Sequence, residues 1–356
     1  MNSGSIYDSE RLSLSLTEWL VTTVICLAVM MTVPTIWQRS VLTESGPDDR
    51  IPYTLSHDYW LFEQTCRQAC EQYEWLFIGD SVVWGHYVPK HQTLSHHLND
   101  KMGSRSVANL GLDGAHPLAL EGLLRYYGPA ISNKNVILHF NPLWMSSPKH
   151  DLQTTKEFHF NHPDLVPQFR PKIPCYQASR ETRFSRVIKR HIDFANWVSH
   201  INLLYYEGMS LPAWTLSHPS DNLLRPGEAS MPGADDYERT DKTNNYPASL
   251  TLDWVPMASS LQWRAFTRTI QLLQQRGNRI SVLVGPFNEH LLTGQNLVRY
   301  NRLKHNIDTW LSQNGTAHLM LEPLPAELYR DASHPTAEGY EMLSEQIAAH
   351  GFLIGP

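Results

Sequence analysis

The chain has 356 residues, of which 42% are hydrophobic and 18% are charged. That much apolar surface can form a large core, which excludes an intrinsically disordered chain and a coiled-coil rod. With 35 acidic and 29 basic residues the formal net charge is −6, so no basic footprint for nucleic acid is present. The 18 histidines occur without HExxH or CxxC spacing, and the sequence therefore predicts neither a metal site nor a cofactor.

The first feature along the chain is an uncharged apolar run from Trp19 to Trp37. A helix of these 19 residues spans roughly 28 Å, which is enough to cross a bilayer. The tryptophan at each end suits the two membrane interfaces. We interpret residues 19–37 as a single transmembrane anchor that follows an N-terminal tail, residues 1–18. A cleaved signal peptide and a buried core helix are the alternatives.

After a linker at residues 38–55, the body at residues 56–356 alternates short apolar runs with amphipathic stretches. This alternation predicts an α/β fold, in which a parallel sheet carries helices on both faces. Five runs of β-branched and aromatic residues predict strands at 75–78, 106–110, 135–140, 279–284 and 317–321. Helices are expected between them at 56–73, 93–102, 117–127, 257–276, 297–312 and 336–349.

One long segment, residues 144–256, breaks the alternation. It is rich in proline, histidine and aromatic residues, and it is too long for an ordinary connection. We interpret it as an insertion that is partly loop, and either a substrate groove or an ordinary excursion packed on the body would explain it. Its most polar part, Pro226 to Pro247, has the composition of a mobile segment.

Four cysteines are too few for a disulfide framework. Cys66 and Cys70 lie four residues apart in an expected helix, where their geometry disfavours a bridge to each other. Packing is therefore the expected role for them, and the isolated Cys175 adds no redox motif.

Polar residues that could carry chemistry follow the predicted strands. Ser81 comes directly after the first strand, at the carboxyl end where open α/β sheets bind ligands. Near the C-terminus, Asp331 precedes His334 by three residues, a spacing at which the carboxylate can hold the Nδ1 proton of the ring. A serine hydroxyl becomes a nucleophile when a base within hydrogen-bond reach accepts its proton, and Ser81, His334 and Asp331 supply nucleophile, base and orienting acid.

Donors for an oxyanion are expected from two further strand ends. Gly114 follows the second strand, and its missing side chain allows a backbone N–H to approach a substrate. Asn141 follows the third strand and offers a side-chain amide, and the backbone N–H of Ser81 would be another donor. Each residue alone also has a structural explanation, as a turn or capping residue. Their joint order at strand ends is what favours catalysis.

In these motifs the sequence resembles the SGNH hydrolases, also called the GDSL esterase and lipase superfamily. The resemblance is carried by four blocks in the family's order: GDSVVWG at 79–85, NLGLDGAHP at 109–117, HFNP at 139–142 and DASHPTAEGY at 331–340. It covers the body from about residue 75 to the C-terminus, without the insertion. The third block departs from the usual Gly-x-Asn-Asp but keeps its asparagine.

The resemblance implies a flavodoxin-like three-layer α/β/α fold. It also implies that Ser81 is the nucleophile, that Asp331 and His334 complete the triad, and that Ser81, Gly114 and Asn141 form the oxyanion hole. Asp80 is expected to brace the nucleophile loop. Three aromatic residues are candidates for pocket lining, with core packing as an equal alternative for the two tryptophans: Trp84, His116 and Trp144.

The function expected from these blocks is hydrolysis of a carboxylic ester, such as an O-acetyl ester or a carbohydrate ester, through an acyl-enzyme. The first alternative is a membrane-anchored O-acyltransferase that modifies an exported polysaccharide together with a multi-spanning acyltransferase, because anchored proteins of this type resemble such accessory proteins. The second alternative is a non-catalytic surface binding module. With a bilayer contacted through residues 19–37, we expect a single-pass membrane protein whose catalytic body lies outside the cytoplasm.

Overall fold

The computed structural model describes residues 14–41, 50–103, 106–220 and 250–351. The chain divides into two compact units, Met1–Thr43 and Glu44–Pro356. The polar stretch from Pro226 to Pro247 lies outside the described residues, so the expectation of mobility stays a prediction.

The described part of the first unit is one helix, α1 (Leu16–Val41). It begins three residues before the predicted anchor, and its apolar portion, Leu16–Gln38, has 23 residues. By length and composition this helix could cross a membrane, although a signal sequence would have the same properties.

The second unit is built on a five-stranded sheet whose strands all run parallel. The strand order is β2-β1-β3-β4-β5. The expected α/β class and all five expected strands are confirmed, with bounds of β1 (Trp75–Gly79), β2 (Val107–Gly111), β3 (Asn135–Phe140), β4 (Arg279–Val284) and β5 (Ala317–Met320). Because the strands are parallel, their carboxyl ends and the loops that follow them lie at one edge of the sheet.

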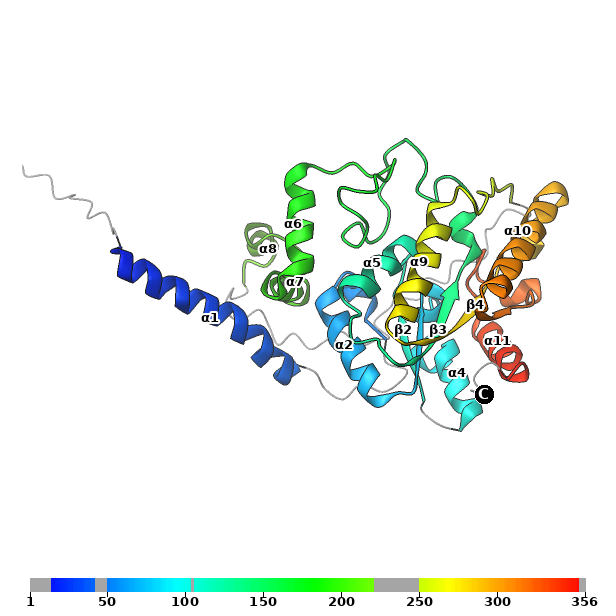
Figure 1. Cartoon of the computed structure of the whole chain (residues 1–356), viewed down its shortest axis with the longest axis horizontal. Helices are drawn as coiled ribbons and strands as arrows, with labels where there is room; N and C mark the ends of the chain where they lie inside the picture. The colour runs from blue at the N-terminus through cyan, green and yellow to red at the C-terminus, as the bar shows by residue number, and fades with distance from the viewer. Residues whose placement is uncertain (1–13, 42–49, 104–105, 221–249, 352–356) are drawn as a thin grey trace, which may run out of the picture. The chain divides into compact units, whose positions relative to one another are not determined.

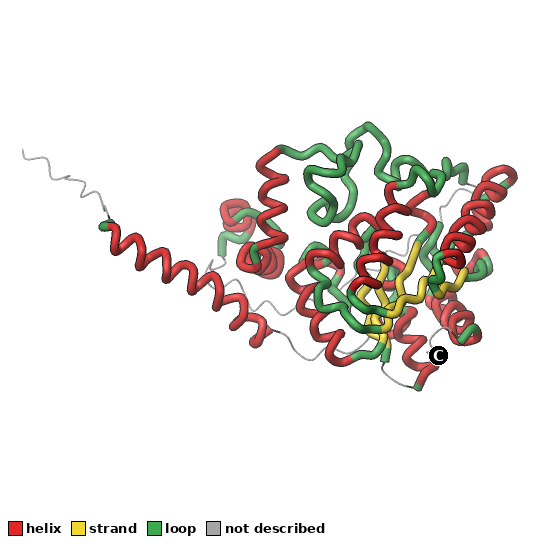
Figure 2. The backbone as a smooth tube through the Cα atoms, in the orientation of Figure 1, coloured by secondary structure: helices red, strands yellow, loops and turns green. Residues whose placement is uncertain are grey.

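Helices cover both faces of this sheet, as Figures 1 and 2 show. On one face, Leu98 of α4 and Leu343 of α11 pack in one cluster with Phe77 of β1. On the opposite face, Phe140 of β3 packs against Phe266 of α9, with ring centroids 4.5 Å apart. The helices of the alternating body are α2 (Tyr59–Gln72), α4 (Leu94–Met102), α5 (Pro117–Tyr126), α9 (Leu261–Gln275), α10 (Gly294–Gln313) and α11 (Ala337–Ala349).

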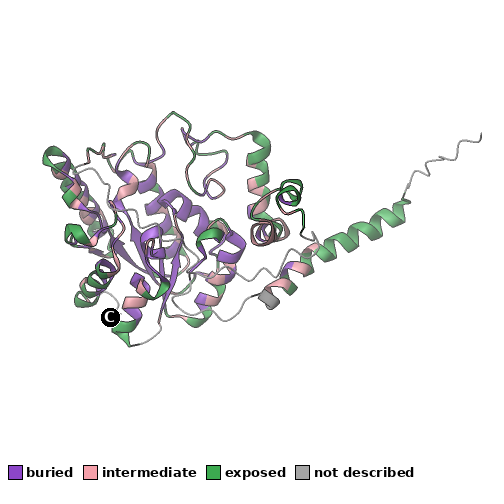
Figure 3. Cartoon of the chain, turned by 180° about the vertical axis from the view of Figure 1, so that it is seen from behind, coloured by how far each residue is buried: buried purple, intermediate pink, exposed green. Residues whose placement is uncertain are grey.

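Several of these helices begin at a residue whose side chain caps them. The side chains of Asp58, Thr93, Ser260 and Thr336 each accept a hydrogen bond from the first turn of α2, α4, α9 and α11. The edge strand β5 is partly exposed. Strands β1 to β4 are buried apart from the first residues of β3 and β4, and Figure 3 shows them as the purple centre of the body. This explains why they read in the sequence as continuous apolar runs.

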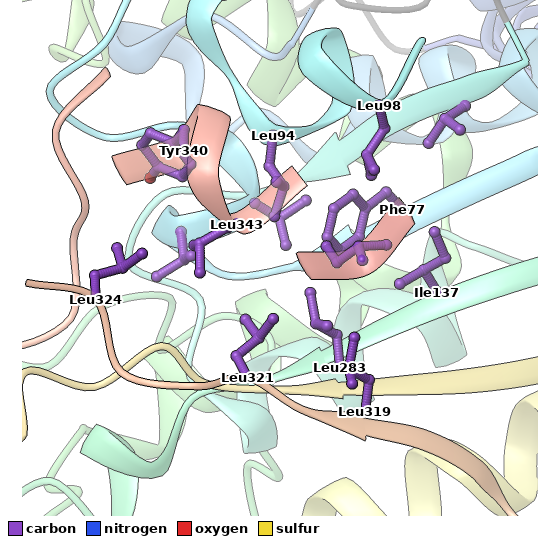
Figure 4. Packing of buried hydrophobic residues seen from close by; sticks show 14 of the residues in the cluster. Phe77, Leu94, Leu98, Ile137, Leu283, Leu319, Leu321, Leu324, Tyr340 and Leu343 are labelled. Carbon is purple, nitrogen blue, oxygen red and sulfur yellow. The ribbon is translucent and has the colours of Figure 1, made fainter. Parts of the chain in front are cut away.

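Figure 4 shows the cluster between the sheet and the α4–α11 layer. Phe77 of β1 and Ile137 of β3 are at most 1% exposed, and Leu343 is fully buried against them. The alternate residues of the same strands point to the other face, as the period of two requires. This packing holds α4 and α11, and therefore the loops at their ends, against the sheet.

The predicted insertion contains more regular structure than the sequence suggests. It includes α6 (Arg180–His191), α7 (Asp193–Tyr206) and α8 (Leu211–Ser217), none of which the sequence patterns indicate. Its first part, before α6, is irregular but packed: Val166, Ile173 and Cys175 are buried in a cluster with residues of α5 and α9. Cys66 and Cys70 on α2 are also buried and unbridged, so the packing role expected for these cysteines is confirmed.

The end of the predicted linker packs on the body. Arg50 is 4% exposed and donates hydrogen bonds to the carbonyl oxygens of Trp84, Gly85 and Val88 at 2.7–2.8 Å. The guanidinium also lies 3.8 Å from the centre of the Trp84 ring. Arg50 therefore holds the segment that follows Ser81 against the residues at the start of the body.

The packing of α11 leads to a stability prediction. Leu343 is fully buried, whereas the neighbouring Met342 is 37% exposed. We expect Leu343→Ala to lower the free energy of unfolding by about 2–5 kcal/mol, because it leaves a cavity in the core. Met342→Ala should change it by less than about 0.5 kcal/mol. Urea unfolding of the full-length chain in detergent measures both, and equal losses would contradict the assigned packing.

Candidate active site

Ser81 lies at the turn between β1 and a short helix, α3 (Ser81–Trp84). Asp80 caps this helix, and its Oδ1 atom accepts a hydrogen bond from the backbone N–H of Val82 at 3.0 Å. The turn fits because Gly111, at the end of β2, has no side chain: a Cβ atom there would lie 2.3 Å from the backbone nitrogen of Trp84. The tight approach of α3 to β2 presents the Ser81 side chain at the carboxyl edge of the sheet.

The three predicted triad residues are brought together, although 253 positions separate Ser81 from His334. The Oγ atom of Ser81 lies 2.7 Å from Nε2 of His334. On the other side of the ring, Nδ1 lies 2.7 Å from Oδ2 of Asp331. Because a carboxylate only accepts, Nδ1 carries the hydrogen, and Nε2 is then the acceptor for the Ser81 hydroxyl.

The loop that carries Asp331 and His334 is itself tightly held. Oδ1 of Asp331 accepts hydrogen bonds from the backbone N–H groups of Ser333 and His334 at 2.9 and 2.8 Å. Thr336 caps α11, so Asp331 is not the helix cap that a purely structural role would make it. Pro335 lies just before this cap.

The charges around the triad favour the protonated form of His334. Burial lowers the pKa of His334, but the Asp331 carboxylate outweighs this effect, with help from Asp80 and Asp113, and the net pKa is raised above 6.5. Burial likewise raises the pKa of Asp331, whereas His334 and the two backbone N–H donors lower it, with a net decrease. Asp331 is therefore ionised and can stabilise a positive charge on the imidazole.

Asp80 connects the Ser81 turn to the residues after β3. It is 2% exposed, and its Oδ2 atom accepts hydrogen bonds from Nδ2 of Asn141 at 3.0 Å and from Nε1 of Trp144 at 2.9 Å. Nδ1 of His139 lies 3.1 Å from its Oδ1 atom. Burial raises the pKa of Asp80, but His139, the Trp144 side chain and the backbone N–H of Val82 overcome the effect and lower it to about 2. The position of Asp80 agrees with the predicted bracing role.

His139 also belongs to this network, although the sequence blocks assign it no role. It is 2% exposed and joins Asp80 to the loop after β4, because its Nε2 atom lies 2.6 Å from the carbonyl oxygen of Gly285. A carbonyl only accepts, so Nε2 carries a hydrogen. The signal in the sequence is that His139 occupies a position in a buried strand where an apolar residue would be expected.

The predicted oxyanion donors lie at the ends of neighbouring strands. Asn141 directly follows β3, and its Oδ1 atom accepts from the backbone N–H of Leu143 at 3.0 Å. One hydrogen of its Nδ2 group is used by Asp80, and the group carries a second one that could be donated to an oxyanion. Asn141 thus serves both as a turn residue and as a brace for the nucleophile turn.

Gly114 lies three residues beyond β2 in a left-handed conformation, with φ of 70°. The loop is tied to the end of β1, because the N–H of Leu112 donates to the carbonyl oxygen of Gly79 at 3.1 Å. A Cβ atom on Gly114 would lie 2.2 Å from Nδ2 of Asn161. Asn161 belongs to the insertion, and its neighbour His162 contacts the carbonyl oxygen of Asp113 through Nε2 at 2.7 Å. The insertion therefore reaches the proposed oxyanion loop, which the sequence does not reveal.

The three aromatic candidates differ in their positions. Trp84 is fully buried and donates through Nε1 to the carbonyl oxygen of Ile51 at 2.7 Å, so it is a core residue. His116 is 1% exposed and caps α5, and burial lowers its pKa to about 4. Trp144 is half-buried beside Asp80. Of the three, Trp144 alone remains a candidate for lining a pocket.

The charge on Asp331 gives a testable expectation for His334. In Asp331→Asn the carboxylate that most strongly opposes the effect of burial is lost, and the pKa of His334 should fall. NMR titration of 13C-labelled histidine rings, with His334 assigned from His334→Gln, measures the change. Asp308→Asn is the control, because Asp308 pairs with His318 at 2.9 Å instead. An unchanged His334 titration in Asp331→Asn would refute the assigned electrostatics.

Comparison with models of known protein families gives no match, and a search of curated proteins finds no similar sequence.

Proposed function

We propose that this protein is a serine esterase that cleaves carboxylic esters through a covalent acyl-enzyme on Ser81. The observation that carries the proposal is the continuous hydrogen-bonded chain from Asp331 through His334 to Ser81, with both contacts at 2.7 Å. This is the arrangement that makes a serine hydroxyl nucleophilic, in which an oriented base accepts the hydroxyl proton. A binding module would have no need of it, and this argues against the non-catalytic alternative.

In the first half-reaction, Oγ of Ser81 attacks the ester carbonyl while Nε2 of His334 takes the hydroxyl proton. The ionised Asp331 stabilises the imidazolium that forms. The negative charge on the carbonyl oxygen would be met by the N–H groups of Ser81 and Gly114 and by the amide of Asn141. His334 then gives its proton to the departing alcohol, and an ester on Ser81 remains.

In the second half-reaction a hydroxyl compound attacks the Ser81 ester. His334, now neutral, accepts the proton of the attacking hydroxyl and returns one to Oγ of Ser81 as the ester bond breaks. Water as the attacking group makes the protein a hydrolase, and an alcohol makes it an acyltransferase. The residues of the triad have the same roles in both cases.

Two observations support the assignment to the SGNH hydrolases. The strand order 2-1-3-4-5 is that of flavodoxin-like doubly wound sheets. In addition, the four sequence blocks lie at the carboxyl ends of β1, β2 and β3 and at the start of α11, and the Asp80 network and the triad join the first, third and fourth of them. We propose that the body is a three-layer α/β/α sandwich of this family.

The apolar helix α1 favours one further candidate function, an O-acyltransferase that works at a membrane with a multi-spanning partner. Its apolar portion is long enough to span a bilayer. A body tethered in this way could act on a polymer at the membrane surface. We propose that α1 is an anchor and that the catalytic body lies outside the cytoplasm.

Replacement of the nucleophile tests the proposal. Ser81→Ala removes the atom that forms the ester, so turnover of p-nitrophenyl acetate by the full-length chain in detergent should fall by about a thousandfold or more. The unfolding temperature should be nearly unchanged. The control is Ser185→Ala at an exposed position on α6, which should retain full activity. Turnover in Ser81→Ala equal to that of the parent would refute catalysis by this residue.

The same assay separates the two enzymatic candidates when a sugar is added. An esterase should release p-nitrophenol at a rate that is independent of the sugar, and the acyl group should appear as free acetate. Faster release together with acetylated sugar would favour the acyltransferase.

A further inference from the structure

Two helices of the insertion, α6 and α7, turn polar side chains toward the body. The buried residue of α6 is Arg190, and the buried residues of α7 are Asn196 and His200. Both helices lie wholly within the described residues, and none of their phenylalanine, tryptophan, isoleucine, leucine or valine side chains is buried. Figure 3 accordingly draws them mainly in green and pink.

Helix α10 of the same chain shows the ordinary arrangement. Its Leu303, Ile307 and Leu311 are buried, whereas Arg302 and Asn306 are exposed. A helix that packs on a core is expected to place its apolar side inward in this way. The arrangement is reversed in α6 and α7.

The inward side of α6 is fixed by three arginines at helical spacing. Arg183 donates a hydrogen bond to the carbonyl oxygen of Tyr176 at 3.0 Å, and Arg190 donates one to that of Asp164 at 2.6 Å. The carboxylate of Asp164 also pairs with Arg186 at 2.7 Å. These contacts hold α6 in one orientation about its axis.

The inward side of α7 is fixed by His200. Its Nδ1 atom lies 2.6 Å from Oδ2 of Asp58, the cap of α2, and its ring centroid lies 4.4 Å from that of Trp60. Asp58 comes eight residues after Arg50, which is bonded to the body. Helix α7 therefore packs against the part of the chain with which the body begins.

The apolar side chains consequently point away from the body. Residues two apart on an α-helix point in nearly opposite directions, roughly 200° apart. Ile188 lies two residues after the inward Arg186, and Val198 lies two residues before the inward His200. Both are exposed, and half of the surface of Ile188 is accessible to solvent.

Further exposed residues extend this surface. The rings of Phe169 and Phe184, both exposed, lie 5.2 Å apart, and Leu216 on α8 is 83% exposed. Helix α8 adjoins α7, because the ring centroids of Tyr206 and Trp214 are 5.4 Å apart. We call the exposed apolar residues of this region the outer face: Phe169, Phe184, Ile188, Val198 and Leu216. Exposed apolar residues that gather on a folded protein mark an interaction surface.

This part of the chain is basic, although the chain as a whole is acidic. Between Phe169 and Ser220 there are seven arginines and lysines against three acidic residues, whereas the whole chain has a net charge of −6. Arg170, Lys172 and Arg180 are exposed, and none of them forms an ion pair with another described residue. Basic residues beside an apolar face are typical of helices that lie in the interface of a bilayer with anionic lipids.

The length of the chain also favours a bilayer as the partner. Helix α1, which could cross a membrane, ends at Val41, and Arg50 is bonded to the body. The nine residues from 42 to 50 span at most roughly 30 Å even when fully extended. If α1 is an anchor, the start of the body therefore stays within this reach of the membrane end of α1.

From these observations we propose that the outer face lies in the interface of a bilayer that contains anionic lipids, as a second membrane contact of the chain besides α1. The apolar side chains enter the boundary between headgroups and acyl chains, and the basic residues meet the lipid phosphates. This contact goes beyond the esterase chemistry. It rests on one part of the proposed function, the anchor, and it is independent of Ser81.

The test measures the surroundings of single nitroxide spin labels on the full-length chain in nanodiscs of phosphatidylcholine and phosphatidylglycerol. Electron paramagnetic resonance reports collisions of the label with oxygen, which is enriched in lipid, and with the nickel complex NiEDDA, which stays in water. The labels are attached to Ile188→Cys or Leu216→Cys in a Cys26→Ser background, because the other three cysteines are buried. Oxygen collisions should exceed those with NiEDDA at both positions.

The lipid charge is tested with the same labels in nanodiscs of phosphatidylcholine alone. The basic residues lose their anionic partners there, so collisions with NiEDDA should become more frequent. Equal collision rates in the two kinds of nanodisc would overturn the assignment of anionic lipids.

Two further labels serve as controls. Ser312→Cys, in the same background, places the label at an exposed position of α10, which Figure 1 shows at the opposite end of the body from α6. NiEDDA collisions should predominate there. The native Cys26 lies in α1, and its label in the otherwise unchanged chain should show the lipid pattern.

Two results at positions 188 and 216 would overturn the inference. Frequent NiEDDA collisions would place the outer face in water, and few collisions with either reagent would mean that protein covers it, either a second copy or residues 221–249. If the Cys26 label shows the lipid pattern in these cases, the anchor stands and only the second contact fails. A Cys26 label in water would overturn the anchor and the inference with it.

Discussion

The buried carboxylate of Asp80 is the interaction on which the site depends. A carboxylate at 2% exposure is costly unless its charge is balanced, and here two side-chain N–H donors, a backbone N–H and a histidine ring surround it. These partners come from α3 and from the segment that ends β3. Satisfying one buried charge therefore fixes the nucleophile turn and Asn141 relative to each other.

The triad is held by a different kind of constraint. Asp331 and His334 share one short loop. Two backbone N–H groups of this loop bind one oxygen of the Asp331 carboxylate, and the other oxygen contacts the His334 ring. The packing of α11 on the sheet then brings this loop to Ser81. Local hydrogen bonds thus set the His–Asp geometry, while core packing sets the distance to Ser81.

The sequence predicts the strands and the convergence of Ser81, Asp331 and His334, and the reasons are local. Buried parallel strands read as short apolar runs, and the helix starts carry Asp58, Thr93, Ser260 and Thr336 as caps. Ser81, Asp331 and His334 lie in short motifs at strand and helix ends. Loops at the carboxyl ends of parallel strands meet at one edge of the sheet, so the place of these motifs in the sequence already indicates that their side chains converge. For such elements the local pattern and the tertiary structure agree.

Other features depend on contacts between distant segments and could not be predicted. The helices of the insertion were missed because the proline-rich and polar stretches around them dominate its composition. Asn161 approaches Gly114, and His86 pairs with Asp113. No helical or strand spacing relates the members of either pair, so the sequence does not indicate that they are in contact. Arg50 lies in a stretch whose sequence is typical of a polar linker. Its role in holding the segment after Ser81 follows only from its hydrogen bonds to three carbonyl groups in the structure.

The central claim is that Ser81 is a nucleophile activated by His334. Labelling the full-length chain with a fluorophosphonate, followed by peptide mass spectrometry, tests it most directly, because the reagent bonds covalently to activated serines. We predict one adduct on the peptide that contains Ser81, with labelling strongly reduced in His334→Gln. An unlabelled Ser81, or labelling that is equally fast in His334→Gln, would contradict the account.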